Sequence, residues 1–392
     1  MKNRWVILGA SIVIQIILGG IYAWSVFTPP LCEGYGLTTG GAGLIFGATV
    51  AVFTLAMIFA GRIQDARGPR LTAGIGAILF GLGYIIASFS GGSLPLLILG
   101  IGVVSGAGIG FGYVCPLATS MKWFPRHKGL ISGVAVAGFG GGAIFLSKGA
   151  SLLLDRGMDV LEIFRLIGIA PGLVAFGASM LLVNPGADPE KKQAEGGKRI
   201  DLKAILFSRT YLVLFTGMFA GTFGGLLIVG NLKPIGLAGG MAGQTATLGI
   251  GLFAIGNAIG RVGWGGIMDR IGFLSIPLCL VMLGFGALLF LGASSPALFL
   301  TATVLSGMSF GGCFVLFAAR VAGIYGTNHF GSVYPLVFLS YGISGITGPT
   351  LAGWIYAGFG SFTAPIALSI AIAWLSALLT WRLGAPGRKQ GR

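Results

Sequence analysis

The sequence predicts an all-α membrane protein with twelve transmembrane helices in two six-helix halves. Three observations support this fold class: the composition, the length of the apolar segments and an internal repeat. Of the 392 residues, 55% are hydrophobic and 9% are charged, whereas a soluble domain carries about 25% charged residues. Many segments exceed the roughly 18 apolar residues that indicate a membrane-spanning helix.

The apolar segments define twelve helices in order along the chain. We place them at about 5–27, 40–60, 70–90, 94–118, 129–150, 161–183, 210–232, 243–264, 274–293, 296–322, 332–356 and 361–381. The first is longer than the apolar core of a cleavable signal peptide and has no small-residue cleavage site before Pro29. We therefore interpret it as a retained helix.

The 72 glycines suit helices that pack closely in lipid, where small residues let two backbones approach each other. The pairs Gly106/Gly110, Gly108/Gly112 and Gly138/Gly142 predict such surfaces. The fragment around Gly106 and Gly108 also resembles part of a dinucleotide-binding loop, but no strand precedes it.

The net charge of +15 is a topology signal rather than evidence for nucleic-acid binding. With the predicted helices, most Lys and Arg residues fall on the side that carries both termini. Only Lys148, Arg156, Arg165 and Lys233 fall on the opposite side. The positive-inside rule then predicts a multi-pass protein of the cell (inner) membrane with both termini in the cytoplasm. We expect the lipid bilayer and no nucleic acid as its surroundings.

A polar linker at 184–203, rich in Pro, Gly and charge, separates an N-terminal half (1–183) from a C-terminal half (204–392). The pattern G-x-x-x-D-x-x-G occurs at 61–68 and again, 204 residues later, at 265–272. The start of the fifth helix, at 128–133, has its counterpart at 330–335, in the eleventh helix. Two such halves, with a binding site between them near the midplane, are typical of secondary transporters.

Arg261 is the most informative residue, because it lies within the apolar segment 252–267. At 1.5 Å rise per residue it is roughly 12 Å from Asp269, near the middle of a hydrocarbon core about 30 Å thick. A guanidinium at that depth needs a polar partner, a water-filled cavity or an anionic ligand. Its planar fork of donors matches a carboxylate, and Asn257 lies one helical turn away on the same face. A purely structural role is the alternative.

Several motifs together carry a resemblance to a known family. They are the two G-x-x-x-D-x-x-G loops with Arg67, Arg70 and Arg270, and the stretches 20–27, 108–116 with 122–125, 256–261, and 353–356. The chain resembles the major facilitator superfamily and, within it, the oxalate/formate antiporter family and the monocarboxylate transporters. This resemblance implies that Arg261 is the carboxylate ligand.

Two loop motifs are candidates for a gate. Asp65 and Asp269 lie at the cytoplasmic ends of helices, beside Arg67, Arg70 and Arg270. A carboxylate near the loop arginines could form a latch that closes in one conformation and opens in another. The resemblance implies the same gating role.

The valence of the substrate depends on a second cation. The resemblance implies that dicarboxylate carriers place a lysine in the eleventh helix, and the stretch 341–344 contains none. Holding a divalent anion against a single deep cation leaves one charge partly desolvated, which is costly. A monocarboxylate is therefore favoured, unless Arg320 supplies the second charge. Arg320 lies nearer the cytoplasmic end, so snorkelling is the alternative.

Aromatic and small residues at matching depth could line the cavity. The candidates are Tyr22, Tyr113, Phe139, Cys313, Phe317 and Tyr341. Such residues are also common as packing residues. Tyr22 and Tyr113 rank highest, because a phenol can donate to a carboxylate while its ring covers a short alkyl chain.

Coupling is left open by the sequence. All ten acidic residues fall in loops or at helix ends, so no midplane carboxylate is available as a proton carrier. The substrate could bring its own proton, a carboxylate near a helix end could titrate, or one anion could be exchanged for another.

We therefore predict a transporter of small monocarboxylates of the lactate, pyruvate or formate class that works by alternating access with a proton. An oxalate/formate-type anion exchanger and a carrier of another small solute are the alternatives. A midplane arginine without a midplane acid argues against a cation as substrate, and no signalling domain is visible. The spans show no set of catalytic groups or metal ligands, so we expect neither an enzyme, nor a metal, nor a cofactor. We expect the monomer to be functional.

Overall fold

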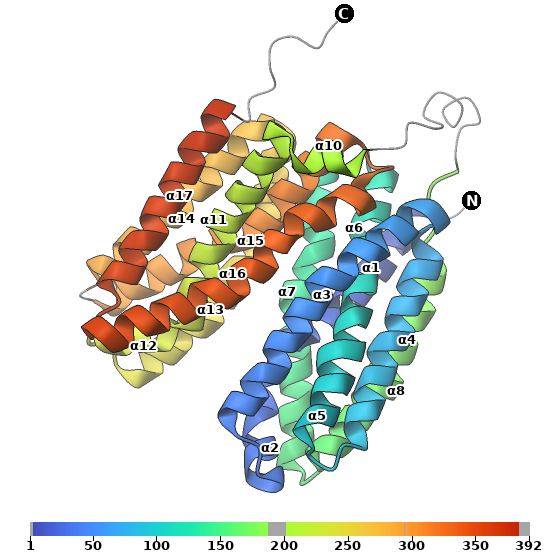
Figure 1. Ribbon diagram of the computed structural model, residues 1–392, viewed down its shortest axis with the longest axis horizontal. Coiled ribbons are helices and arrows are strands. Elements are labelled where there is room, and N and C mark those ends of the chain that lie inside the picture. Colours follow the sequence, from blue (N-terminus) through green and yellow to red (C-terminus); the bar gives the residue numbers. More distant parts are fainter. Residues whose placement is uncertain (1–2, 187–200, 294, 384–392) are drawn as a thin grey trace, which may run out of the picture. The chain divides into compact units, whose positions relative to one another are not determined.

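The computed structural model describes residues 3–186, 201–293 and 295–383. Within these ranges every regular element is a helix (Figure 1). Eleven segments are long and apolar enough to cross a membrane, and one of them, Gly243–Leu291, contains two helices joined by a short turn. This part of the chain therefore has twelve spanning helices, and the predicted fold class is confirmed.

The chain divides into two compact units. The first comprises Met1–Arg126, Val134–Ile200 and Ala322–Pro335, and the second comprises His127–Gly133, Asp201–Val321 and Leu336–Arg392. Each unit thus includes one short segment from the opposite half of the sequence, an exchange that the predicted boundaries do not contain. Residues 187–200 of the predicted linker lie outside the described residues.

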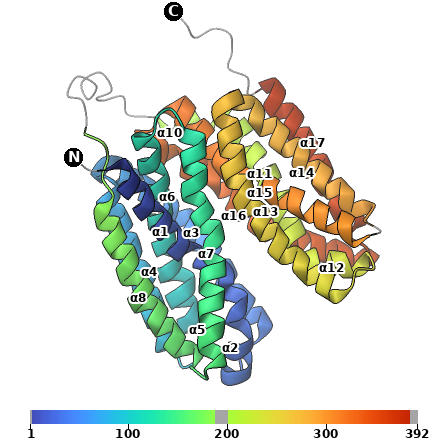
Figure 2. The same ribbon diagram turned by 180° about the vertical axis from the view of Figure 1, so that it is seen from behind.

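The first unit is built on the helices of the N-terminal half. They are α1 (Arg4–Gly19) with the 3-10 segment η1 (Gly20–Val26), α3 (Thr39–Arg67), α4 (Pro69–Ser88), α5 (Leu94–Leu97) with the π-helical segment η2 (Ile98–Ser105) and α6 (Gly106–Trp123), α7 (Lys128–Asp155) and α8 (Val160–Leu181). A short helix α2 (Thr28–Tyr35) follows the first span. Helix α4 packs against both α8 and α6, and α1 packs against α6 and α8 (Figures 1 and 2).

Close backbone contact explains the glycines of this unit. A Cβ on Gly108 of α6 would overlap the backbone nitrogen of Phe80 on α4, and a Cβ on Gly142 of α7 would overlap the backbone of α1. Since lipid supplies no hydrophobic drive between helices, such small residues let van der Waals packing hold them together. The predicted glycine surfaces are confirmed.

The second unit is built on the helices of the C-terminal half. They are α11 (Arg209–Gly230), α13 (Gly243–Ile271), α14 (Ser275–Leu291), α15 (Pro296–Tyr325), α16 (Phe330–Phe359) and α17 (Thr363–Leu383), with the short helices α10 (Leu202–Leu206), α12 (Leu232–Ala238) and η3 (Gly272–Leu274) between them. Helix α14 lies along α17, and both contact α11 (Figure 1).

Two helix ends differ from the prediction. Helices α3 and α13 were expected to end near residues 60 and 264, with the repeated motifs in loops, but they continue to Arg67 and Ile271. Only the last glycine of each motif turns the chain: Gly68 has φ 87° and Gly272 has φ 61°, a region that glycine enters without steric penalty. The motif aspartates therefore lie on the last helical turns, where the helix axis fixes their direction.

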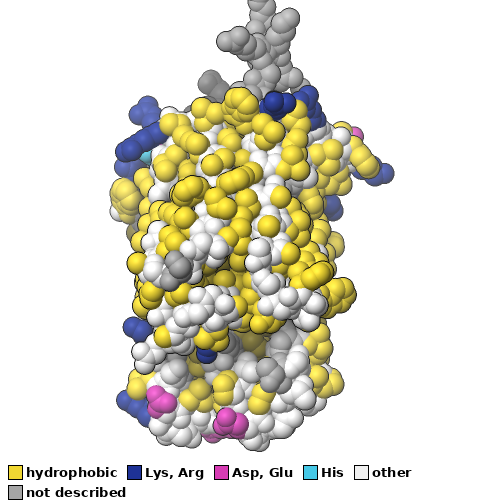
Figure 3. Space-filling view, turned by 90° about the vertical axis from the view of Figure 1, so that its left-hand side faces the viewer, with side chains coloured by type: hydrophobic (Ala, Val, Ile, Leu, Met, Phe, Trp, Pro, Cys, Tyr) yellow, Lys and Arg dark blue, Asp and Glu magenta, His cyan; other side chains and the backbone are white. Residues whose placement is uncertain are grey.

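The surface agrees with a membrane environment. Figure 3 shows one face of the molecule, on which hydrophobic side chains cover most of the area. Exposed leucines, isoleucines and phenylalanines occur along most of the spanning helices. Such continuous apolar surface is unfavourable in water but matches hydrocarbon.

Candidate functional site

Arg261 is buried in the middle of a long helix. Helix α13 begins at Gly243 and ends at Ile271, so Arg261 lies roughly 27 Å from its start and 15 Å from its end. Its side chain is 1% exposed. Asn257, one turn earlier, accepts a hydrogen bond from the Arg261 Nε through its Oδ1, at 2.9 Å. The predicted pairing of these two residues is therefore present in the structure.

A ring of α15 covers the guanidinium, and rings of α16 pack on that ring. The Cζ of Arg261 lies 4.8 Å from the ring centroid of Phe314 on α15. Tyr341 of α16 packs on the same ring, with centroids 5.2 Å apart, and also on Phe338. A cation over an aromatic face is attracted by the ring quadrupole. The Arg261 site thus combines a fixed charge with one predicted residue, Tyr341, and one residue that the sequence reasoning missed, Phe314.

The missed residue lies one position from a predicted one. Cys313 and Phe317 were chosen as an i, i+4 pair on α15, but they pack against α11: a Cβ at Gly217 would lie 2.8 Å from Phe317, and Gly221 faces the Cys313 Sγ. The neighbouring i, i+4 pair, Phe310 and Phe314, forms an edge-on aromatic contact. Each residue advances an α-helix by about 100°. The pair Phe310 and Phe314 therefore lies on a different face of α15 from Cys313 and Phe317.

The first unit holds a second aromatic cluster from four helices. Phe139 of α7 packs edge-on against Tyr22 and Tyr113, with centroids 5.4 Å and 5.0 Å apart. Phe53 of α3 completes the cluster against Tyr113. The three predicted residues are therefore brought together. Tyr22 lies in the 3-10 segment η1, an irregularity that often marks a functional hinge.

Arg320 lies at a different level from Arg261. It is half-buried, five residues before the end of α15, and its Cζ lies 4.8 Å from the ring of Phe273. Phe273 belongs to η3, the turn between α13 and α14. Arg320 is thus directed toward a helix end, as a snorkelling side chain would be.

Asp65 binds the beginning of another helix. Its carboxylate accepts hydrogen bonds from the backbone nitrogens of Gly331 (3.1 Å) and Ser332 (2.7 Å) and from the Ser332 hydroxyl (2.8 Å). These residues form the first turn of α16. The first amides of a helix have no partner within it and carry partial positive charge. Asp65 therefore acts as a charged cap on α16, inside the first unit.

Asp269 makes the equivalent contact in the second unit. It accepts hydrogen bonds from the backbone nitrogens of Gly129 and Leu130, both at 2.8 Å, in the first turn of α7. The contact depends on glycine, because a Cβ at Gly265 would overlap the Gly129 carbonyl oxygen. In the same way, Gly61 faces Gly331. The first glycine of each motif lets a second helix approach, and the aspartate one turn later reaches its amides.

The loop arginines Arg67, Arg70 and Arg270 are exposed. The two motif carboxylates bind backbone amides, because a helix N-terminus offers two or three aligned donors at once. Both partners of each contact lie in repeated stretches of the sequence, the aspartates at 61–68 and 265–272 and the helix starts at 128–133 and 330–335. The sequence did not predict that they bind each other.

The described acidic residues lie at helix ends or in short helices, as the sequence indicated. Asp159 caps α8 and Asp201 caps α10, each through a backbone amide at the helix start. Asp159 also accepts a hydrogen bond from the Tyr35 hydroxyl at 2.7 Å. In the part of the chain that is described, no group of three His, Cys, Asp or Glu residues could hold a metal ion.

Comparisons with known proteins identify the family of this chain. The family description "Major Facilitator Superfamily" matches residues 9–278. The oxalate:formate antiporter of Oxalobacter formigenes is 27% identical over 404 aligned residues, which cover 99% of this chain and 94% of that protein. Human monocarboxylate transporter 11 is 28% identical over 93% of this chain and 79% of its own length.

The fold is also similar to a solved transporter. The fucose:proton symporter of Escherichia coli superposes with a TM-score of 0.73 at 16% identity, over 97% of this chain and 99% of that one. At this identity the likeness concerns the fold alone. Together, the twelve spanning helices, the repeated helix-capping motif and the family match show that this chain belongs to the major facilitator superfamily of membrane transporters.

Proposed function

We propose that the protein transports small monocarboxylates of the lactate, pyruvate or formate class by alternating access. The single observation that carries this proposal is Arg261, buried at mid-helix and oriented by Asn257. A guanidinium stays charged at physiological pH and binds a carboxylate through two parallel hydrogen bonds. The bond from Nε to Asn257 sets the plane of the guanidinium and so the direction from which a carboxylate approaches.

The aromatic residues suit a short organic anion. Phe314 and Tyr341 surround the Arg261 site, and Tyr22, Tyr113 and Phe139 form the cluster of the first unit. We propose that a phenol from either cluster donates to the carboxylate while the rings cover the alkyl part. Cys313 and Phe317 would contribute to substrate binding indirectly, because they pack against α11 and so hold that helix in place.

A single deep cation favours a single negative charge. The helix α16 stretch from Tyr341 to Ser344 has no lysine, and Arg320 contacts Phe273 near a helix end. Oxalate would therefore keep one carboxylate poorly compensated. The relative from Oxalobacter formigenes is named an oxalate:formate antiporter. Anion exchange is therefore the second candidate, in which Arg320 would provide the other cation. A carrier of another small solute is the third.

Proton coupling would use the substrate or a helix end. The acidic residues of the described chain lie at helix termini or in short helices, so we propose that the acid form of the substrate carries the proton or that a terminal carboxylate titrates. We propose Asp65 and Asp269, with the neighbouring Arg67, Arg70 and Arg270, as the gate at the cytoplasmic end. Both termini are cytoplasmic in this scheme, and the monomer in the inner membrane is the working unit.

Uptake into proteoliposomes tests the proposal. Labelled lactate, pyruvate, formate, acetate and oxalate are supplied with and without an inward proton gradient, to wild type and to Arg261→Lys. Lysine keeps the positive charge but cannot donate two parallel hydrogen bonds to one carboxylate. Loss of one charged hydrogen bond, worth about 1.5–3 kcal/mol, should lower the apparent affinity for the carboxylate by roughly 10- to 150-fold.

Arg165→Lys is the matched control, because Arg165 also stacks on an aromatic ring, that of Phe89, but is exposed near the start of α8. Uptake by this variant should equal that of wild type. Carboxylate flux that is unchanged in Arg261→Lys, or absent in wild type, would overturn the proposal. Oxalate exchange that requires Arg320 would replace it with the exchanger.

A further inference from the structure

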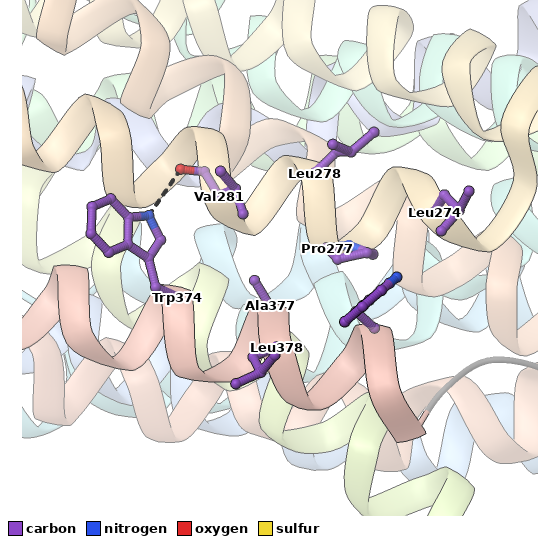
Figure 4. Close-up of a pocket in the computed structure, with 8 residues that line it drawn as sticks. Leu274, Pro277, Leu278, Val281, Trp374, Ala377 and Leu378 are labelled. Atoms are coloured by element: carbon purple, nitrogen blue, oxygen red, sulfur yellow. Dashed lines mark hydrogen bonds between the residues drawn. The ribbon is translucent and has the colours of Figure 1, made fainter.

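A groove runs along the outer side of the second unit, between α14 and α17. Its volume is about 400 Å³, within the range of roughly 300–1,000 Å³ that small-molecule sites occupy. The lining residues come from two antiparallel helices (Figure 4): Leu274, Pro277, Leu278 and Val281, and Trp374, Ala377, Leu378 and Trp381. All eight side chains are apolar or aromatic.

One end of the groove is lined by Trp374, whose indole is held by a hydrogen bond. The Trp374 Nε1 donates a hydrogen bond to the carbonyl of Val281 at 3.2 Å (Figure 4). Gly284 makes room for this indole, because a Cβ there would overlap its Nε1. The ring is therefore held across the two helices. A side chain of fixed orientation therefore marks this end of the groove.

The groove is on membrane-spanning helices, so the molecules that can reach it are those of the bilayer. Both helices lie in membrane spans, and the lining residues Leu278 and Trp381 are 51% and 55% exposed. An apolar groove on a membrane span faces hydrocarbon rather than water. A single turn of a helix about 10 Å across has a volume of about 400 Å³. The groove could therefore accommodate only one turn of a second protein helix, which would bury little of its surface there. A flexible acyl chain fits.

Two arginines stand close in the sequence to the lining residues at the end opposite Trp374, which we call the open end of the groove. Leu274 lies immediately before α14, and Trp381 lies two residues before the end of α17. Arg270 precedes Leu274 by four residues, and Arg382 follows Trp381 directly; both arginines are exposed. Neither 273–291 nor 363–383 contains Asp or Glu, and Asp269 is bound to the α7 amides. An interfacial tryptophan beside basic residues is typical of the level of lipid headgroups.

We propose that this groove binds an anionic phospholipid of the cytoplasmic leaflet. One acyl chain lies between Leu278 and Leu378 with its end against Trp374. The phosphate lies at the open end, near Arg270 and Arg382. The site is separate from Arg261, so it holds a lipid whether or not carboxylates are the substrate.

Native mass spectrometry of the purified protein tests the site, with phosphatidylglycerol and phosphatidylcholine of identical chains as probes. Wild type should retain one phosphatidylglycerol in preference to phosphatidylcholine. Ala377→Phe fills the groove and should abolish retention, whereas Leu375→Phe, on the same helix but outside the groove, should not. Arg382→Gln removes a surface charge worth about 1 kcal/mol toward anionic lipid, so it should weaken phosphatidylglycerol retention about fivefold. Arg165→Gln is its control.

Brominated phosphatidylglycerol gives a second readout, since bromine quenches a tryptophan that it touches. Quenching should fall in Trp374→Phe and Trp381→Phe but not in Trp354→Phe, which replaces another exposed tryptophan. Equal retention of the two lipids, or retention that survives Ala377→Phe, would overturn the proposal. A dimer cross-linked through Leu278→Cys would assign the groove to a second copy instead.

Discussion

The helix cap made by Asp65 leads to a quantitative prediction. In Asp65→Asn the side chain keeps its shape but loses its charge. Three donors reach the carboxylate, from Gly331 and from the amide and hydroxyl of Ser332. Charged hydrogen bonds contribute about 1.5–3 kcal/mol each and neutral ones about 1 kcal/mol. The asparagine oxygen can still accept, so we expect a net loss of about 2–4 kcal/mol.

The assay is amide hydrogen exchange of the first turn of α16. Exchange of these amides requires opening of the cap, and its rate reports the free energy of that local opening. A loss of about 2–4 kcal/mol corresponds to roughly 30- to 900-fold faster exchange. The α8 start, capped by Asp159, serves as the internal control and should exchange as in wild type.

The repeat supplies a matched comparison. Asp269 makes only two such bonds and is exposed, so solvent screens it more. Asp269→Asn should therefore cost about 1–2 kcal/mol and accelerate exchange at the start of α7 by roughly 5- to 30-fold. Unchanged exchange in Asp65→Asn, or a larger effect at Asp269, would refute the idea that charge-assisted capping holds these helix starts.

Three further predictions follow from the contacts. Gly331→Ala should lower the free energy of unfolding by about 1–3 kcal/mol, because its Cβ would lie 2.6 Å from the Asp65 carboxylate. Gly353→Ala, on the same helix with open space around it, should leave the free energy of unfolding unchanged. Equal melting temperatures for the two variants would contradict the close approach. Phe314→Leu should raise the apparent KM for carboxylate roughly 2- to 30-fold through the lost cation–π contact with Arg261 of about 0.5–2 kcal/mol, while Phe310→Leu, measured in the same uptake assay, should have the smaller effect. Burial, followed by the hydrogen bond to Asp159, raises the pKa of Tyr35 from 10.0 to about 12, so the folded state holds this proton more tightly; the corresponding stability is fully present below pH 10 and is lost between about pH 10 and about pH 12. In a profile of unfolding free energy against pH, Tyr35→Phe should lose less stability between about pH 10 and about pH 12 than wild type. Identical profiles for the two proteins would contradict this contribution of Tyr35.

Most of the fold could be predicted from the sequence because membrane helices depend on local composition. Each span needs enough consecutive apolar residues to cross the hydrocarbon, and this requirement is visible in the chain alone. The short helices α2, α10 and α12 were not predicted. They have eight residues or fewer, too few for a hydrophobic period to be recognised.

The Arg261 site was predicted only in part. Asn257 is local to Arg261, one turn away on the same helix, so spacing was enough to identify it. Phe314 comes from α15, and which face of α15 meets α13 depends on how the helices pack. Glycine contacts set that packing: Gly260 of α13 touches the backbone of Met308, and Gly311 of α15 touches Asn257. These contacts orient α15 so that Phe314, rather than Cys313, faces the guanidinium.

The sequence by itself determined the membrane class, the twelve spans and the deep arginine, because each depends on residues that are near one another in the chain. It also determined the repeat, which is visible when the two halves of the chain are compared. The tertiary structure alone decided what the motif aspartates bind. Asp65 and Gly331 are separated by 266 residues, and Asp269 and Gly129 by 140. The partners are backbone amides, which every residue except proline carries. The repeat marks the stretches 128–133 and 330–335, but no side-chain pattern identifies their amides as the partners of the aspartates. The close approach of two glycine-bearing helices brings the charge to the helix end.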